Sequence, residues 1–385
     1  MAAIHLPRTI RIGGGTLAEL PQALAQSGLS RPAIVTDAWI AQCGVLDQVL
    51  AILAEAGMPA RAFCEAIPDP TVASIEAATA FVRDGDHDCV IGLGGGSPID
   101  TAKAVAVLVR SPRPMRELKS PHQEDEPGLP IVAIPTTAGT GSEATRFTII
   151  TDQTTDEKML CAGLAYLPSI AIVDFELTLS KPARLTADTG IDSLVHAIEA
   201  YVSKRANPFA DSMALSAMRL IWPNLPRACA DPGDRAAREA LMLGALQGGI
   251  AFSNSSVALV HGMSRPIGAH FHVSHGLSNA MLMPVVTRWS APGAQHRYAK
   301  CARTMAIAHD SESDQTAVGR LVEALEAINA ELKVPSPAAY GIDKARWDEL
   351  LPLMAEQALA SGSPGNNPRV PQAEEIVELY RQAWS

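Results

Sequence analysis

The apolar residues follow different patterns in the two halves of the chain, and this difference constrains the fold more than any other feature. In the first half, short continuous apolar runs end at Gly, Pro, Thr or Asp, at residues 33–36, 89–93, 131–134 and 170–174. Such runs are typical of strands buried on both faces of a parallel sheet. Ala-rich, helix-forming segments separate them, as at 75–83 and 99–108. This alternation predicts an α/β domain with a parallel sheet.

After about residue 180 the apolar positions recur every three or four residues in long stretches rich in Ala, Leu and Met, such as 188–203, 208–220, 235–252 and 316–332. That spacing predicts helices. We therefore expect an α/β domain at 1–180 and an all-helical domain at 181–385, which agrees with roughly 150 residues per domain. No repeat or low-complexity linker separates them, so we expect direct packing with a ligand-binding cleft between the two.

Composition excludes several classes of protein. The chain is 47% hydrophobic and 19% charged, as in an ordinary folded protein. Its net charge of −10 and the lack of a basic block argue against a nucleic-acid partner. With no signal-like start and no apolar run near ~20 residues, we expect a soluble cytoplasmic protein and no membrane partner. The six cysteines form no Cys-x-x-Cys pair, which argues against a zinc ribbon, a redox dithiol or a disulfide framework.

A glycine-rich segment directly follows the strand predicted at 89–93. Gly94, Gly95 and Gly96 let the backbone approach an anion, and Ser97 and Pro98 open a helix whose free N–H groups favour a phosphate. The segment is interpreted as a pyrophosphate site, with a simple tight turn as the alternative. It differs from the Rossmann fingerprint, in which an acidic residue follows the glycines by ~20 positions.

Two further segments follow predicted strands. Asp37 could accept hydrogen bonds from an adenosine ribose and repel a 2′-phosphate, which favours NAD over NADP; a helix N-cap explains it equally well. The loop at 135–143 is rich in Thr and Gly, and it either contacts phosphate and ribose or only turns the chain.

A second group of polar residues lies in the helical half. Asp192 and His196 are four residues apart and share one helix face. Four of the ten histidines, His261, His270, His272 and His275, fall in one 15-residue window. Neutral imidazoles and a carboxylate together suit Fe²⁺ or Zn²⁺. Taken separately, each group could also be an ordinary helical pair or a set of surface histidines.

Motifs at 94–103, 135–147, 188–201, 261–269 with 275–276, and 365–369 occur in this order along nearly the whole chain. In these motifs the sequence resembles the iron-containing (group III) alcohol dehydrogenases. The resemblance implies a dehydroquinate synthase-like fold, with an N-terminal α/β dinucleotide-binding domain and a helical C-terminal domain. It also implies one divalent metal, Fe²⁺ or alternatively Zn²⁺, bound by Asp192, His196, His261 and His275. His270 and His272 do not match ligand positions.

The resemblance also implies a binding site for NAD. Asp37 corresponds to the position at the adenosine ribose, and Gly96 and Ser97 to positions at the pyrophosphate. The full set of cofactor-binding candidates is Asp37, Gly94, Gly95, Gly96, Ser97, Asp100, Thr136, Thr137, Thr140, Thr145, Phe147 and Lys158. The implied activity is hydride transfer between NAD and a small alcohol or aldehyde, in a homodimer or larger homo-oligomer.

One position departs from the family pattern. Many members carry a histidine four residues after the position of His261, and here that residue is Arg265. A guanidinium there predicts a substrate with a carboxylate, sulfonate or phosphonate beside its carbonyl, unless Arg265 pairs with a structural acid. The alternatives are a metal-independent reductase of the maleylacetate reductase type, a polyol dehydrogenase of the glycerol dehydrogenase type, and a non-catalytic NAD sensor. The intact set of four metal-ligand candidates argues against the first and the last.

Overall fold

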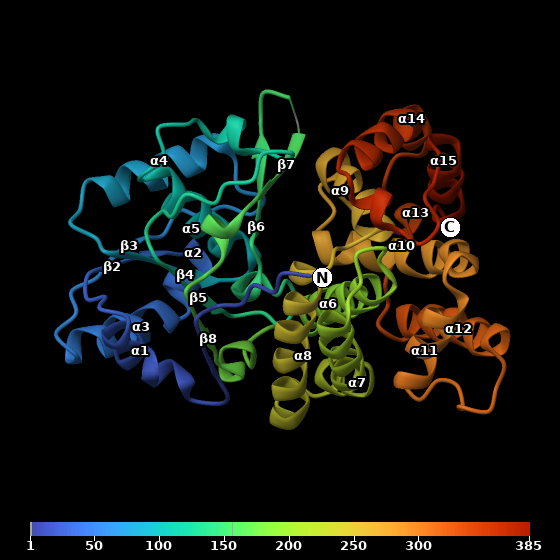
Figure 1. The fold of residues 1–385 in the computed structure, drawn as a ribbon, viewed down its shortest axis with the longest axis horizontal. Coiled ribbons are helices and arrows are strands. Elements are labelled where there is room, and N and C mark those ends of the chain that lie inside the picture. Colours follow the sequence, from blue (N-terminus) through green and yellow to red (C-terminus); the bar gives the residue numbers. More distant parts are fainter. Residues whose placement is uncertain (1, 156) are drawn as a thin grey trace. The chain divides into compact units, whose positions relative to one another are not determined.

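The computed structural model describes residues 2–155 and 157–385. Its chain divides into two compact units, which are described separately here. One is an α/β unit, His5–Ser180, drawn in blue to green in Figure 1. The other is a helical unit, which comprises Lys181–Ser385 and the N-terminal residues up to Ile4.

The α/β unit is built on a six-stranded parallel sheet. In spatial order its strands are β1 (Thr9–Ile12), β8 (Ile170–Val173), β5 (Ile131–Pro135), β4 (Cys89–Gly94), β2 (Pro32–Val35) and β3 (Arg61–Phe63). The four predicted strands are the four central ones, so those predictions are confirmed. The edge strands β1 and β3 were missed because they are short and only partly buried, and therefore lack a continuous apolar run.

Helices cover both faces of this sheet (Figure 1). Ile34 and Ile91 face the helices α1 (Leu20–Gln26) and α3 (Val45–Glu55) in one apolar cluster. Val35 and Val90 face α4 (Val72–Arg83) and α5 (Gly96–Leu108) in another. Successive side chains of a strand point to opposite faces, so each central strand contributes to both clusters. The short helix α2 (Ala38–Gln42) follows β2, and the hairpin β6 (Phe147–Asp152) and β7 (Glu157–Ala162) forms a separate antiparallel sheet.

The order of the strands reverses direction between β2 and β4. From β2 the chain continues outward to β3, then returns to β4 and continues the other way through β5 to β8. In open α/β sheets, ligands bind outside the carboxyl ends of the strands at such a point. Asp37 and the glycine segment follow β2 and β4 at this edge.

The helical unit contains α6 (Ala183–Val202), α7 (Pro208–Ala230), α8 (Arg235–Asn254), α9 (Leu259–Phe271), α10 (His275–Ser290), α11 (Gln295–Thr304), α12 (Asp314–Glu331), α13 (Pro337–Tyr340), α14 (Lys344–Ala360) and α15 (Ala373–Gln382). The described part of the chain forms no strand after β8, as predicted. Helix α6 is buried on nearly all sides, and it packs against α7, α8 and α10. Helix α7 continues ten residues beyond the segment predicted at 208–220 and includes Pro223 and Pro226.

Short 3₁₀ helices connect these elements: η1 (Thr16–Glu19), η2 (Met115–Leu118), η3 (Ser142–Ala144), η4 (Leu164–Tyr166), η5 (Phe175–Thr178), η6 (Ala291–Gly293) and η7 (Ser363–Asn366). Among the described helices, none by itself has the length and apolar composition to span a membrane. Only α8 and α9 taken together reach that threshold, and the chain bends by 104° between them.

Candidate metal centre and cofactor loops

Four side chains predicted from the sequence come together inside the helical unit. Asp192 and His196 extend from α6, His261 from α9 and His275 from α10. One potential ligand atom from each lies within 4.8 Å of the others. The first three side chains are buried, whereas His275 is 42% exposed. The cluster can therefore be reached from one side.

The connection between α9 and α10 explains how His275 reaches α6. Helix α9 ends where His272 adopts a left-handed backbone conformation, with φ of 55°. Helix α10 then begins at His275, and its second residue, Gly276, lies against the backbone of α6. A Cβ at Gly276 would lie 2.4 Å from the carbonyl oxygen of Asp188. Only glycine permits this close approach, which brings His275 beside Asp192.

The spacing of the donor atoms fits a divalent cation. The Nε2 atoms of His196, His261 and His275 lie 3.8, 3.5 and 3.7 Å from Oδ1 of Asp192. Two ligands that are each about 2.1 Å from a tetrahedral metal lie about 3.4 Å apart. One carboxylate and three imidazoles also form a donor set that suits Fe²⁺ or Zn²⁺.

The acid–base properties of the cluster favour positive charge at this place. Burial alone would raise the pKa of Asp192, but the imidazoles of His196, His275 and His261 outweigh it and lower that pKa. Burial would lower the pKa of His261, yet hydrogen bonds to Asp192 and Glu199 raise it to about 9. The two carboxylates therefore stabilise a cation beside them, whether it is a proton on His261 or a metal ion.

Two residues of this site were missed in the sequence. Asn279 lies one turn after His275, and its Nδ2 is 2.6 Å from Asp192 Oδ1 and 3.2 Å from Nε2 of both His261 and His275. Glu199 lies three residues after His196, and its carboxylate is 2.7 Å from Nδ1 of His261. Their positions three and four residues after ligand candidates on the same helices were the available signal.

The other two histidines of the 261–275 window lie outside the cluster, as the resemblance implied. Nε2 of His270 lies 2.8 Å from the side-chain oxygen of Gln357, and His272 is the C-cap of α9. Arg265 lies one turn after His261 and is partly buried. Burial lowers the pKa of Arg265 to about 10, an effect that the negative charge of Glu199 opposes. Within residues 2–155 and 157–385, the Arg265 guanidinium makes no hydrogen bond and no ion pair.

In the α/β unit, the glycine segment and the Thr-rich loop meet. Gly94 has a φ of 147°, which favours glycine, and its carbonyl accepts a hydrogen bond from the Thr136 N–H. A Cβ at Gly96 would lie 2.9 Å from Cγ2 of Thr140, and one at Gly95 would contact Thr137. Helix α5 begins at Gly96, and no described side chain caps it. Its first N–H groups, at Gly96 and Ser97, are available to a phosphate.

Asp100 and Lys103 of α5 hold the loop that follows β5. The Asp100 carboxylate accepts hydrogen bonds from the Ser142 hydroxyl (2.9 Å) and the Ile149 N–H (3.0 Å). Nζ of Lys103 donates to the carbonyl oxygens of Thr145 and Phe147, both at 2.9 Å, and to the Thr145 hydroxyl at 3.0 Å. Sequence reasoning did not select Lys103. These contacts position the loop, and direct contact of Asp100, Thr145 or Phe147 with a cofactor stays a prediction.

Two other cofactor candidates also have partners inside the chain. Asp37 is the N-cap of α2, where its side chain accepts a hydrogen bond from the Ile40 N–H at 2.9 Å. The capping alternative is thus realised, although one carboxylate can cap a helix and still face a ribose. Lys158 in β7 forms an ion pair with Asp69 at 2.7 Å.

The fold and the site together define a class of protein. Its α/β unit has the parallel sheet and glycine segment typical of nucleotide-binding domains, and its helical unit holds a cluster of Asp and His side chains arranged to bind a metal ion. The family model described as "Iron-containing alcohol dehydrogenase" matches residues 7–175, and "Fe-containing alcohol dehydrogenase family, C-terminal" matches 186–384. The chain belongs to the iron-containing alcohol dehydrogenase family. It is accordingly an oxidoreductase of the alcohol dehydrogenase and aldehyde reductase type that uses a nicotinamide cofactor, NAD or NADP.

Individual relatives match along the whole chain. Lactaldehyde reductase of Escherichia coli is 34% identical over 98% of both chains, and NAD-dependent methanol dehydrogenase of Bacillus methanolicus is 35% identical over 100% of both. NADPH-dependent butanol dehydrogenase of Clostridium saccharobutylicum is 32% identical, covering 99% of this chain and 97% of the relative.

Solved structures agree. A structure of 1,3-propanediol oxidoreductase matches with a TM-score of 0.95 at 32% identity, covering 100% of both chains. Sulfoacetaldehyde reductase from Bifidobacterium kashiwanohense, solved in complex with NAD⁺, matches with a TM-score of 0.89 at 25% identity, covering 100% of this chain and 99% of that one.

Proposed function

We propose that this protein interconverts a small alcohol and its aldehyde with NAD(H), using one divalent metal ion, Fe²⁺ or alternatively Zn²⁺, held by Asp192, His196, His261 and His275. The observation that carries the proposal is the convergence of these four ligand atoms within 4.8 Å. A metal-independent reductase or a nucleotide sensor would not require four convergent ligand atoms on three buried side chains and one exposed one.

In the forward reaction, the alcohol carbon loses a hydride to the nicotinamide ring of NAD⁺, which becomes NADH, the hydroxyl proton is released to solvent, and the alcohol becomes the aldehyde. The metal ion, when bound, supplies a Lewis acid that polarises the substrate C–O group. The chain's own residues exclude water from the centre and bind the cofactor. Burial of Asp192, His196 and His261 keeps water away from most of the centre, and Gly96 and Ser97 present backbone N–H groups to the pyrophosphate.

Anaerobic purification followed by elemental analysis tests the proposal directly. NADH oxidation is measured with a panel of short aldehydes before and after treatment with a chelator. We expect about one metal ion per chain and turnover that is lost on chelation and restored by Fe²⁺ or Zn²⁺. Turnover that survives complete removal of metal would contradict the proposal and favour the maleylacetate reductase type.

We also propose a preference for NAD over NADP, because the Asp37 carboxylate lies at the carboxyl end of β2 where a 2′-phosphate would meet negative charge. Asp37→Asn keeps a side chain that can cap α2 and removes only the charge. We expect kcat/KM for NADPH relative to NADH to rise by about 10-fold, on the order of one lost charge repulsion. An unchanged ratio would show that Asp37 acts only as a cap.

Arg265 supports a substrate that carries an anionic group. Arg265 lies one helical turn from His261, and its guanidinium forms no hydrogen bond or ion pair among the described residues, although the charge of Glu199 acts on it. Its N–H donors therefore remain available to a carboxylate, sulfonate or phosphonate. The structural relative named as a sulfoacetaldehyde reductase acts, by its name, on an aldehyde of that kind.

The test compares Arg265→Ala with Arg265→Lys on matched anionic and neutral aldehydes. We expect alanine to raise KM for the anionic substrates by about 10- to 100-fold with little change for the neutral ones, as for the loss of a charge-assisted hydrogen bond. Lysine keeps the charge without the bidentate geometry, so its effect should be intermediate. Equal changes in KM for both substrate types would overturn this part of the proposal.

Assembly as a homodimer or larger homo-oligomer, and a cytoplasmic location, complete the proposal. The first follows from the resemblance to the family, and the second from the lack of an apolar run near the ~20 residues needed to cross a bilayer. Light scattering of the purified protein tests the first, because a mass near 40.6 kDa would identify a monomer.

A further inference from the structure

Glu199 makes contacts that none of the metal-ligand candidates makes. It is on α6, three residues after His196, and is only 4% exposed. One carboxylate oxygen accepts hydrogen bonds from the Ala258 N–H (2.8 Å) and from Nδ1 of His261 (2.7 Å). The other oxygen accepts from the Val260 N–H at 2.6 Å. The carboxylate is thus surrounded by three donors, all at the start of α9.

These contacts determine which nitrogen of His261 is available to a metal. An ionised carboxylate can only accept hydrogen bonds, so Nδ1 of His261 must carry its proton. In the neutral ring the lone pair is then on Nε2, the atom that lies 3.5 Å from Asp192 Oδ1 within the ligand cluster, and a metal ion binds there in place of a second proton. A carboxylate behind a ligating histidine also increases the basicity of that histidine and holds the ring in place.

The same side chain fixes the start of α9. This helix has Ala258 at its N-cap, which offers no side-chain acceptor, so its first N–H groups need one from elsewhere. Glu199 supplies it from α6, the helix that carries Asp192 and His196. Two ligand-bearing helices are therefore held together by one carboxylate placed directly behind the third ligand.

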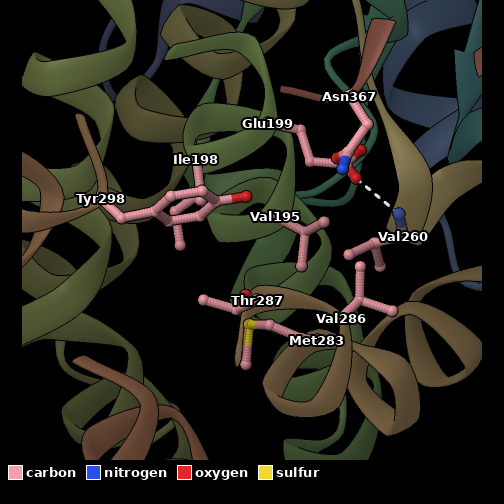
Figure 2. Close-up of a pocket in the computed structure, with 9 residues that line it drawn as sticks. All are labelled: Val195, Ile198, Glu199, Val260, Met283, Val286, Thr287, Tyr298 and Asn367. Carbon is pink, nitrogen blue, oxygen red and sulfur yellow. Dashed lines mark hydrogen bonds between the residues drawn. The ribbon is translucent and has the colours of Figure 1, made fainter. Parts of the chain in front are cut away.

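The surroundings of Glu199 strengthen these hydrogen bonds. Figure 2 shows the carboxylate directed at the Val260 N–H within a pocket whose other walls include Val195, Tyr298 and Asn367. The cavity is about 10 Å³, room for one water molecule at most. Hydrogen bonds to a charged group are stronger in a buried, mostly apolar environment of this kind. Asn367 belongs to the 365–369 motif, and it donates to the Ser290 hydroxyl at 2.9 Å.

We propose that Glu199 is a positioning residue of the metal centre, which holds His261 as the Nδ1-protonated tautomer and fixes α9 so that Nε2 of His261 faces the metal. The inference rests on the proposed metal-dependent function. Glu199 itself is not a metal ligand, because its carboxylate lies on the opposite side of the His261 ring from the ligand cluster.

The decisive experiment measures metal affinity in the full-length protein with Glu199→Gln. Glutamine keeps the shape but replaces one acceptor oxygen with an NH₂ group, so at least one of the three donors loses its partner and the negative charge is lost. Metal-free protein is titrated with Zn²⁺ in competition with a chromophoric chelator. We expect Kd to rise by about 10- to 100-fold, as for other residues that support a metal-ligating histidine. The absorption of the Co²⁺-loaded protein in the visible range should change as well.

A control separates positioning from general loss of stability. Asp174 in the α/β unit is also a buried carboxylate that accepts backbone hydrogen bonds, from the N–H groups of Leu17 and Glu176, both at 3.0 Å. Asp174→Asn should lower the melting temperature of the metal-free protein without changing Kd for Zn²⁺ or the Co²⁺ spectrum. Glu199→Gln should change all three.

The possible results lead to distinct conclusions. If the wild-type protein binds no metal, the proposed function fails, and the inference fails with it. If the wild type binds Zn²⁺ and Glu199→Gln binds it within about 2-fold, only the inference about Glu199 is overturned. Should the glutamine variant not fold, Glu199→Asp keeps the charge on a side chain shortened by one methylene; a wild-type Kd and Co²⁺ spectrum for this variant would likewise overturn the inference.

Discussion

Each unit of the molecule buries a cluster of ionisable side chains, and the two clusters balance their charges differently. In the α/β unit, the buried carboxyl group of Glu143 and the partly buried one of Asp100 lie near the buried ammonium of Lys103, so the chain supplies its own cation. In the helical unit, Asp192 and Glu199 are buried with three imidazoles that offer lone pairs to a common centre. No lysine or arginine forms an ion pair with either carboxylate among the described residues.

The comparison shows how a structural cluster can be distinguished from a ligand site. Lys103 donates hydrogen bonds to two backbone carbonyls and one hydroxyl, and these contacts hold the Thr145–Phe147 segment in place. The Asp192 cluster instead concentrates acceptors, and the electropositive groups nearest to Asp192 Oδ1 are the amide of Asn279 and the imidazoles. Acceptors gathered in a buried site favour a cation from outside the chain.

The largest expected effect follows from Asp192→Asn, which keeps the size of the side chain and removes its negative charge. We expect metal content to fall from about one ion per chain to near zero, and kcat/KM to fall by about 1000-fold, because the Lewis acid contributes several kcal/mol. Elemental analysis and NADH oxidation measure the two effects. A variant that keeps both its metal and its turnover would contradict the distinction between the two clusters, because the negative charge of Asp192 would then not be needed to bind a cation.

Lys103→Met tests the other cluster. Removing the ammonium leaves the buried Glu143 and the partly buried Asp100 without their cation, so we expect the free energy of unfolding to fall by about 3 kcal/mol. Denaturation in urea measures this change, and elemental analysis should show unchanged metal content. If the urea midpoint stays the same and metal is lost instead, Lys103 would belong to the function of the helical unit and the two clusters would not be independent.

The last effect concerns pH. Burial raises the pKa of Glu143 from its usual 4.5 to about 7, although the nearby Lys103 opposes this shift. Between these values the folded protein holds a proton that the unfolded chain has lost, so this group's contribution to stability is complete below pH 4.5 and disappears as pH rises to about 7.

Glu143→Gln cannot titrate and should lack this pH dependence. Relative to wild type, the variant should therefore gain about 3 kcal/mol of stability between pH 4.5 and pH 8. Urea unfolding of the metal-free proteins across this range measures the difference. Parallel stability curves for the two proteins would contradict the assignment of a buried, protonated Glu143.

The parts of the fold that were predictable share one physical property, a strong local pattern. The strands at 89–93 and 131–134 are buried on both faces, and their continuous apolar runs indicate this burial in the sequence. The edge strand β3 is half exposed, and its Arg61 and Ala62 carry no such signal. Asp192 and His196 were recognisable because both lie on one helix at a spacing of four.

The remaining members of the site depended on contacts between distant parts of the chain. Glu199 meets His261 across 62 residues, and Asn279 meets Asp192 across 87. A buried glutamate on a helix suggests a partner, but the partner's identity follows only from how α6 and α9 pack.

The sequence alone determined the types of the elements, the α/β and helical halves, the family and four metal-ligand candidates, since each is encoded in short-range periodicity or in continuous motifs. Only the tertiary structure decided that Glu199 holds His261 in one tautomer, that Asn279 lies among the ligand atoms and that Lys103 balances Asp100 and Glu143. The physical reason is that hydrogen bonds and charge pairs act over a few ångströms in space, whatever the distance along the chain, and only packing brings these groups within that range.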